Sequence, residues 1–593
     1  MSKKLSRREL LKGTALVAGS AAATAALSGC TKVVTQVVEV EKEVEKVVTQ
    51  VVEVEKTGPI NSFGLALPPD ARPLDQQVWK IGSDMTAAHG HWMKSLYNLL
   101  WGNTMHDEPL VGLDYNNDPF PCGAESWQIA EDGSYWDFPL RKELVWTDGT
   151  PVTAHDYEWT LKWTMGNGYD FGWYYSDVKN AMPVLNREMD PSELGVEALD
   201  DYTLRIYTNF PCPYLPMVMC FYMPMSKTAF DAHGEMYELD PATYNGCGPW
   251  TLTKFDRATG CEFELFKDYK GVRKVYFEKC IMGPMAGGLA AYMAGDVPSY
   301  GMGAGTPPGE QAFINTNPVL RGESHPVAPN ITSYLGFSMD PGKFPPLDNY
   351  DVRLALCKAV DKETMVGAVG KGFALPAWGI LPPGFVNYNG DVLKQQDCNV
   401  FDVEAARQLL SKAGYPDGKD FPEFEVYCRT TITPYMEAAQ AAWKENLGIT
   451  IQLKALDYAS YGEQVWTNKL APMYRVEYSL DYFDPSTFLN VFRDGGRHPH
   501  SNPEWTANYN IANATLDPVK RMELLKQSEM DLVNSLCFYG LQCDISYELF
   551  PCTLGGDFAT PDRNGFLNGY ARGRSAYNDL YWTTSTCRDS LEK

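Results

Sequence analysis

Two aspartates lie within an aromatic stretch, YRVEYSLDYFDPSTFLN, that covers residues 474–490. An ionised carboxylate loses hydration beside aromatic rings, so Asp481 and Asp484 each need a compensating partner. The partner can be an arginine, a metal, a proton or a ligand that arrives from solution. In a purely structural interpretation, Asp481 pairs with Arg475 or caps the turn before Pro485. Asp484, which directly precedes the proline, is predicted to be a turn residue.

Two His-x-His pairs are further candidates for chemistry. His89/His91 and His498/His500 would each place both imidazoles on one face of a strand, where a metal can bind. No HExxH motif or nearby cysteine completes a ligand set. We therefore predict surface or loop histidines and no resident metal or other cofactor. A metal that enters already chelated stays an open alternative.

Motifs of covalent catalysis are missing from the sequence. The chain has no GxSxG elbow, and no SxxK accompanied by its partner motifs. Glycosidases use paired carboxyl groups, but residues 30–593 hold 74 acidic residues, so one such pair is uninformative. We predict that the protein is not an enzyme.

The first thirty residues carry an export signal. SRRELLK at residues 6–12 is a twin-arginine pattern, and a mildly apolar, Ala-rich run follows it. That run is too short and too weakly apolar for a durable membrane span. LSGC ends it at Cys30 and is similar to the lipobox of bacterial lipoproteins. We predict a Tat-type lipoprotein signal peptide at residues 1–29, and lipid anchoring through Cys30 on the extracytoplasmic face of the cell membrane.

Residues 30–58 contain a repeat. The unit VVTQVVEVEKEVEK is followed by a second copy cut short after ten residues. Valines recur at alternating spacings of four and three from Val33 to Val54, which is a heptad seam. Because valine also favours extended chain, we predict a stalk that is either helical or extended.

The charge balance excludes polyanionic partners. The chain has a formal net charge of −24, and residues 1–29 hold five Lys/Arg and one Glu, so residues 30–593 carry −28. Nucleic acids and anionic lipid surfaces repel such a chain. We predict that no nucleic acid is a partner.

The cysteines give no clear framework. There are fourteen, Cys30 included, without CxxC pairs or zinc-ligand spacing. Three local disulfides are open alternatives: Cys212/Cys220, Cys247/Cys261 and Cys543/Cys552. The remaining cysteines are predicted to be small buried apolar residues.

Helix and strand patterns alternate after Gly58. We predict a strand, a turn at Asp148-Gly149, and a helix capped by Thr153 with Asp156 as its capping-box acid. Further helices are predicted to begin at Asp402, Pro434 and Pro518, the last two ending at Gly448 and Ser535. This alternation indicates an α/β protein with mostly parallel sheets, and about 535 residues suffice for two or three domains. No nucleotide-binding glycine loop is present.

Several segments together resemble one family. AESWQIAEDGSYWDFPLRKELVWTDGTPVTAHDYEWTLKW, at residues 124–163, looks like its most recognisable block. Further similar segments are NGCGPWTLTKFDRATGCEFELFKDY, the blocks around DVR at 351–353 and AVD at 359–361, FDVEAARQLLSKAGYPDG, SLDYFDPSTFLN and NPEWTANYNIANATLDPVKRMELLKQSEMDLV. They follow in order from about residue 78 to 550. The family is that of the family 5 extracellular solute-binding proteins, the peptide- and nickel-type receptors of ABC importers.

The resemblance implies an α/β, two-lobed, periplasmic-binding-protein-like fold that closes about a hinge. The first lobe of the family is discontinuous and carries an extra subdomain. The expected parts are lobe I at 59–330 with a subdomain at about 101–204, lobe II at 331–543, and a return to lobe I at 544–593.

The resemblance also implies a ligand site. Asp481 stands where peptide-binding members pair an aspartate with the ligand's α-ammonium group, and Arg475 where some members meet a ligand carboxylate. Tyr478, Tyr482 and Trp378 are expected to supply amphipathic walls. Leu480 departs from the family, which has a small residue there.

A peptide-like cargo, delivered to ABC permease subunits, is the leading implication of the resemblance. An oligosaccharide is the alternative, because aromatic residues make up 13% of the chain and can stack on sugar rings. A metal chelate, or a sensory lipoprotein without a transporter, stays open.

Overall fold

A computed structural model represents the whole chain. It describes residues 34–40, 48–54, 58–82, 89–95, 107–285, 287–499, 501–568 and 579–588. The predicted signal peptide, the lipidation at Cys30 and His500 lie outside these residues. The chain divides into two units, residues 1–58 and 59–593.

The repeat of the first unit forms a β-hairpin. β1 (Val34–Val40) and β2 (Val48–Val54) pair antiparallel, with Val34 opposite Val54. Both strands read VTQVVEV, because each comes from one copy of the repeat. The helical alternative is therefore wrong for these residues. The branched valine side chain favours the extended conformation.

A six-stranded mixed sheet organises residues 331–544. Its strands are β15 (Ile331–Phe337), β16 (Ala374–Pro376), β17 (Phe424–Arg429), β18 (Ile451–Leu456), β19 (Met473–Ser479) and β20 (Phe538–Asp544). The order is β16-β20-β15-β19-β17-β18. Only β17 with β18 and β17 with β19 pair parallel in this sheet. β15 and β20 pair antiparallel. The chain enters the sheet on β15 and leaves it on β20.

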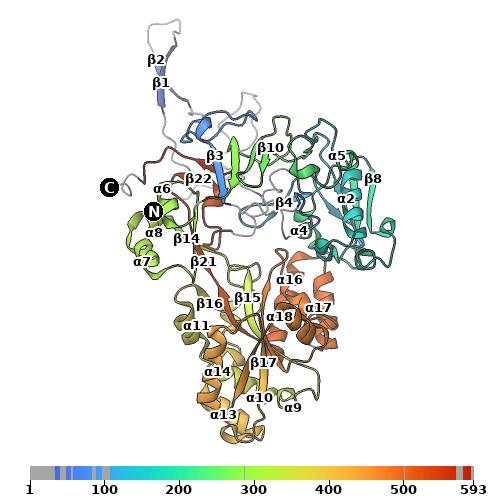
Figure 1. Cartoon of the computed structure of the whole chain (residues 1–593), viewed down its shortest axis with the longest axis vertical. Helices are drawn as coiled ribbons and strands as arrows, with labels where there is room; N and C mark the ends of the chain where they lie inside the picture. Colours follow the sequence, from blue (N-terminus) through green and yellow to red (C-terminus); the bar gives the residue numbers. More distant parts are fainter. Residues whose placement is uncertain are drawn as a thin grey trace, which may run out of the picture. The chain divides into compact units, whose positions relative to one another are not determined.

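Helices pack beside this sheet (Figure 1). They include α10 (Tyr350–Lys358), α11 (Lys362–Gly370), α13 (Val403–Lys412), α14 (Pro434–Leu447), α17 (Pro503–Ala514) and α18 (Pro518–Ser535). The predicted helix ends are confirmed. Asp402 accepts a hydrogen bond from the Ala405 N–H at 2.9 Å, and Gly448 ends α14 with φ of 73°. These local rules hold because capping depends only on neighbouring residues.

Smaller sheets build residues 59–330. One contains β3 (Val78–Gly82), β10 (Trp250–Asp256), β11 (Gly260–Leu265) and β12 (Lys279–Gly283); another contains β6 (Gln128–Ile129), β7 (Tyr135–Pro139), β8 (Val196–Asp200) and β9 (Thr203–Tyr207). α2 (Ala154–Gly166) packs on the second of these sheets, and Asp156 accepts from the Thr153 N–H at 2.8 Å as predicted. Among the described strands, most pairs are antiparallel. The prediction of mostly parallel sheets is wrong because hairpins such as β10–β11 replace helical crossovers.

The end of the chain returns to its beginning. β21 (Ser546–Leu549) pairs with β13 (Tyr300–Met302) and β14 (Ser324–Val327), and β22 (Leu554–Gly555) pairs with β23 (Tyr581–Trp582). The Arg72 N–H donates to the carbonyl of Trp582 at 2.8 Å. The lobe and subdomain boundaries expected from the sequence stay a prediction.

Short elements complete the described chain. They are α3 (Ala181–Leu185), α4 (Leu215–Val218), α5 (Lys227–His233), α6 (Leu289–Ala294), α7 (Pro308–Thr316), α8 (Pro318–Glu323), α9 (Pro345–Asp348), α12 (Gly390–Leu393), α15 (Tyr458–Tyr461), α16 (Ser486–Leu489), β4 (Val111–Leu113) and β5 (Pro119–Pro121). No helix in the described part of the chain has the length and apolar character needed to cross a membrane.

One disulfide joins Cys552 and Cys587. The three pairs considered from the sequence are not formed, since Cys212, Cys220, Cys247, Cys261 and Cys543 are free and buried. Proximity in sequence misled here, because the partner of Cys552 is 35 residues away and returns through β23.

Replacing Cys587 with serine should lower the free energy of unfolding by about 2–4 kcal/mol, because the bridge closes a 35-residue loop and restricts the unfolded chain. Calorimetry of the variant, with peptide mapping under non-reducing conditions, measures this. Cys543→Ser is the control and should keep the bridge. A map that joins Cys543 to Cys552 would contradict the structure.

Candidate functional site

The Asp481 turn links β19 to α16, and Asp481 is partly exposed in it. The Tyr478 hydroxyl donates to Asp481 Oδ2 at 2.8 Å. The Asp481 N–H donates to Thr487 Oγ1 at 2.9 Å. These bonds orient the aspartate, and one of its carboxylate oxygens is held by an uncharged donor.

Asp484, three residues later, has a structural role. Its carboxylate forms two hydrogen bonds with the Arg521 guanidinium, at 2.7 and 2.8 Å, and accepts from the Ser486 N–H and hydroxyl. Burial raises the pKa of Asp484, but Arg521 and Ser486 outweigh it and hold that pKa below the usual value. The prediction of a turn residue is confirmed.

Arg475 belongs to β19 and is 3% exposed. Its guanidinium pairs with Glu477, and its Nε donates to Ser333 Oγ at 3.1 Å. Arg475 therefore pairs with Glu477, and not with Asp481 as one alternative from the sequence had it, because residues two apart on a strand lie on the same face. A ligand carboxylate at Arg475 would share the guanidinium with Glu477.

The two tyrosines next to Asp481 differ in their surroundings. Tyr478 is partly buried, and burial followed by the nearby Asp481 charge raises the pKa of its hydroxyl. Tyr482 is 7% exposed and stacks on Tyr214, with ring centroids 5.2 Å apart and an angle of 8° between the planes. The Tyr482 ring, which was expected to face a ligand, is therefore buried against Tyr214.

Trp378 lies in a loop after β16, and the buried side chains of Lys362 and Glu529 form hydrogen bonds with the backbone of this loop. Lys362 Nζ donates to the Ala377 carbonyl at 2.8 Å, and the ammonium stands 5.0 Å from the centre of the Trp378 ring. Glu529 Oε1 accepts from the N–H groups of Ile380 and Leu381, both at 2.9 Å. Burial lowers the pKa of Lys362 to about 7 and raises that of Glu529 to about 7.

Three of the four paired histidines lie in the described part of the chain, and His500 does not. No group of three or more His, Cys, Asp or Glu suited to a metal occurs among the described residues. His498 is buried, with Nε2 2.5 Å from the Tyr334 hydroxyl, and His91 is buried 3.7 Å from Asp107. Both lie in loops, as the prediction of surface or loop histidines allows, but they are buried and each has a polar partner inside the protein.

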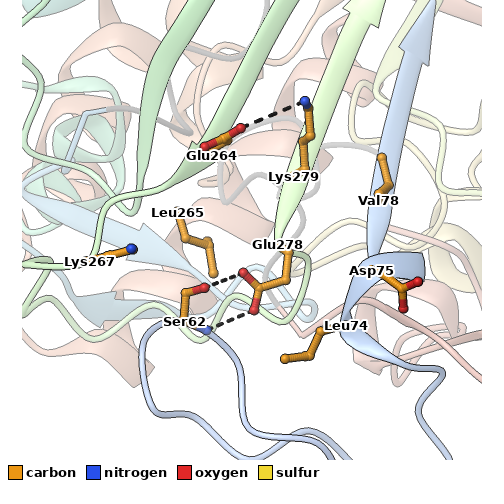
Figure 2. Close-up of a pocket in the computed structure, with 9 residues that line it drawn as sticks. All are labelled: Ser62, Leu74, Asp75, Val78, Glu264, Leu265, Lys267, Glu278 and Lys279. Carbon is orange, nitrogen blue, oxygen red and sulfur yellow. Dashed lines mark hydrogen bonds and ion pairs between the residues drawn. The ribbon is translucent and has the colours of Figure 1, made fainter.

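A separate pocket of about 280 Å³ lies beside β3, β11 and β12. Figure 2 shows acidic side chains (Asp75, Glu264, Glu278) and basic ones (Lys267, Lys279) around apolar Leu74, Val78 and Leu265. Glu278 is occupied by the Ser62 N–H and hydroxyl, at 2.8 and 2.6 Å. None of the residues predicted for the ligand site lines this pocket.

Comparison with known proteins identifies the family of the chain. Residues 118–500 match the profile of bacterial extracellular solute-binding proteins, family 5 Middle. The chain belongs to this family. The oligopeptide-binding protein OppA of Bacillus subtilis is 26% identical over 444 residues, covering 71% of this chain and 79% of the relative. The probable deoxycholate-binding protein YgiS of Escherichia coli is 24% identical over 446 residues, covering 71% and 79%.

A solved structure supports the fold. The unliganded open form of the murein tripeptide-binding protein MppA superposes with a TM-score of 0.71 at 20% identity, covering 88% of this chain and all of the other. This likeness confirms the two-lobed α/β fold expected from the sequence. The matched residues 118–500 include the Asp481 turn.

Sequence reasoning missed four residues around the site: Lys362, Glu529, Tyr214 and Arg521. Their contacts join segments far apart in the chain, and no local motif marks them. Lys362 follows the recognised AVD block and Arg521 lies in an expected helix, yet neither pattern names a partner.

Glu529→Gln should change how stability depends on pH. Burial in the folded protein raises the pKa of the Glu529 carboxyl from 4.5 to about 7. The folded state therefore binds the proton more tightly than the unfolded state, and the wild type loses stability as the pH rises through this range. Glutamine does not titrate. Between pH 4.5 and 7.5 the free energy of unfolding of Glu529→Gln should therefore rise by on the order of 3 kcal/mol relative to that of the wild type. Urea unfolding at several pH values measures the difference. Glu523→Gln, an exposed change on the same helix, is the control; parallel profiles for wild type and Glu529→Gln would refute the assignment.

Proposed function

We propose that this protein is an extracytoplasmic receptor that binds peptide-like cargo and delivers it to an ABC importer. The observation that carries the proposal is Asp481, a partly exposed carboxylate at the end of a buried strand, oriented by Tyr478 at 2.8 Å. A fixed carboxylate suits an α-ammonium group that loses water when the lobes close. The OppA relative is named for oligopeptides, which supports this cargo.

The neighbouring acid explains why Asp481 rather than Asp484 takes this role. Asp484 already shares its charge with Arg521 in two hydrogen bonds. An ammonium at Asp484 would have to displace a buried guanidinium, and breaking a buried pair costs about 3–5 kcal/mol. Asp481 needs no such exchange with Arg521.

Binding would work by hinge closure without catalysis. Cargo that contacts both lobes binds the closed arrangement better and shifts the population toward it. The permease subunits would then receive the closed form. Arg475 could meet a cargo carboxylate only by sharing its guanidinium with Glu477.

We also propose export by the Tat route and attachment to the membrane through lipid on Cys30. The twin arginines, the Ala-rich run and LSGC support this. The valine-rich hairpin would then separate the receptor from the anchor.

Asp481→Asn should weaken peptide affinity about 10- to 100-fold, because a charge-assisted hydrogen bond contributes about 1.5–3 kcal/mol. Native mass spectrometry of the mature protein with an equimolar mixture of tri- to pentapeptides identifies binders, and titration calorimetry measures them. N-acetylated copies of the same peptides should bind as weakly as the variant does.

Two controls make this result specific. Asp340→Asn removes a surface acid after β15 and should leave affinity unchanged. Equal affinity of wild type and Asp481→Asn for every bound peptide would refute the ammonium role. Binding of deoxycholate or an oligosaccharide, with no peptide bound, would refute the proposed cargo.

Cys30→Ala should release the protein from membranes, because a receptor without its lipid has no other membrane attachment in the proposal. Fractionation of expressing cells, with mass spectrometry of the wild-type N-terminus, tests this. The twin-arginine variant Arg7→Lys/Arg8→Lys should instead block export. A Cys30→Ala protein that stays in the membrane fraction would rule out the anchor.

A further inference from the structure

Tyr482 inserts into an aromatic cluster built by a distant part of the chain. Besides stacking on Tyr214, its ring meets Tyr174 edge to face at 6.4 Å. Tyr174 itself packs on Phe171 and Phe221, at 4.8 and 4.9 Å. The turn that carries Asp481 is thus attached to residues 171–221, which precede the six-stranded sheet in the chain.

Hydrogen bonds of Tyr214 reinforce this attachment on both sides. Its hydroxyl donates to Asp177 Oδ2 at 2.7 Å and accepts from Asn513 Nδ2 at 3.3 Å. Asp177 precedes α3, whereas Asn513 belongs to α17. In Figure 1 the α4 region, which follows Tyr214, lies next to α16 and α17.

Arg521 connects Tyr214 to the turn itself. The guanidinium lies 5.1 Å from the centre of the Tyr214 ring and donates to Asn513 Oδ1 at 2.9 Å. The same guanidinium holds Asp484. A continuous set of contacts therefore runs from Asp177 through Tyr214 and Arg521 to the turn that begins at Asp481.

The contact between Tyr214 and Tyr482 is buried, which favours its stability. Tyr214 is 3% exposed and Tyr482 is 7% exposed. Stacked aromatic pairs contribute about 0.5–1.5 kcal/mol beyond their buried area, and each hydrogen bond a similar net amount. Water does not compete for either ring.

We propose that Tyr214 is a positioning residue that clasps the Asp481 turn to residues 171–221, and so couples occupancy of Asp481 to the contact between the two parts of the chain. We call Asp177, Tyr214, Tyr482 and Asn513 the tyrosine clasp. In this role Tyr482 serves the clasp rather than the cargo. The coupling rests on the proposed function, whereas the clasp rests on the contacts of Tyr214 and Tyr482 and is tested without cargo.

Hydrogen exchange of the ligand-free mature protein tests the clasp. Tyr214→Ala should speed exchange at least about tenfold in two segments, residues 481–492 and 212–222, because their mutual contact is lost. Exchange in β15 and β20 should stay as in the wild type. Tyr214→Phe keeps the stacked ring and loses both hydroxyl bonds, so it should raise exchange in both segments by a smaller factor than Tyr214→Ala does.

Tyr157→Ala is the matched control. Tyr157 is also a fully buried tyrosine, but its hydroxyl donates to the Glu108 carbonyl and its ring meets Tyr222, and neither contact involves the Asp481 turn. This variant should leave exchange at 481–492 unchanged. If Tyr214→Ala does not fold, Tyr214→Phe alone must raise exchange in both segments.

Trialanine at millimolar concentration tests the coupling. In the wild type it should slow exchange at 212–222 as well as at 481–492; in Tyr214→Ala only the second segment should respond. Slowing at 212–222 in Tyr214→Ala, or no slowing there in a wild type protected at 481–492, would refute the coupling. If trialanine protects neither segment, the coupling fails; the peptide mixture still decides the proposed cargo, and the ligand-free result still decides the clasp. Unchanged ligand-free exchange in Tyr214→Ala would refute the clasp.

Discussion

The buried ion pair between Asp484 and Arg521 determines how the rest of the candidate site is placed. The Arg521 and Asp484 side chains are 3% and 6% exposed, so each charge would be costly without the other. The pair joins the turn after β19 to α18, and it holds Arg521 against the Tyr214 ring. The short turn from Asp481 to Thr487 has little conformational freedom, because Arg521 holds Asp484 within it.

Two aspartates three residues apart thus have separate roles because their surroundings differ. Asp484 has an arginine and a serine, which hold its pKa low. Asp481 has a tyrosine hydroxyl on one oxygen and remains partly exposed. Composition alone predicts two costly carboxylates here; only the folded position of Arg521 shows that Asp484 is paired with this buried arginine.

Local features of the fold were predictable, and long-range features were not. The Asp402 cap, the Gly448 end and the Pro518–Ser535 helix follow from neighbouring residues, and the structure confirms them. Strand directions, the partner of Cys552 and the histidine environments depend on segments that meet only after folding. The family resemblance predicted the two-lobed fold, which is confirmed, whereas the ligand-site roles of Asp481, Arg475, Tyr478, Tyr482 and Trp378 stay predictions. It gave no information on the contacts of Tyr214 or Glu529, because similarity along one segment does not name the residue that the segment meets after folding.

Glycines show how closely the Trp378 loop fits its support. A Cβ atom at Gly540, in β20, would lie 2.6 Å from the Ala377 carbonyl oxygen, and one at Gly379 would lie 2.4 Å from Glu529 Oε1. Any larger residue at these positions would push the loop off the strand or off the carboxylate. Lys362 and Glu529 bind the loop through its backbone, so these contacts do not involve the side chain at position 378. A smaller residue at position 378 would remove the ring that faces the Lys362 ammonium and would leave the backbone contacts in place.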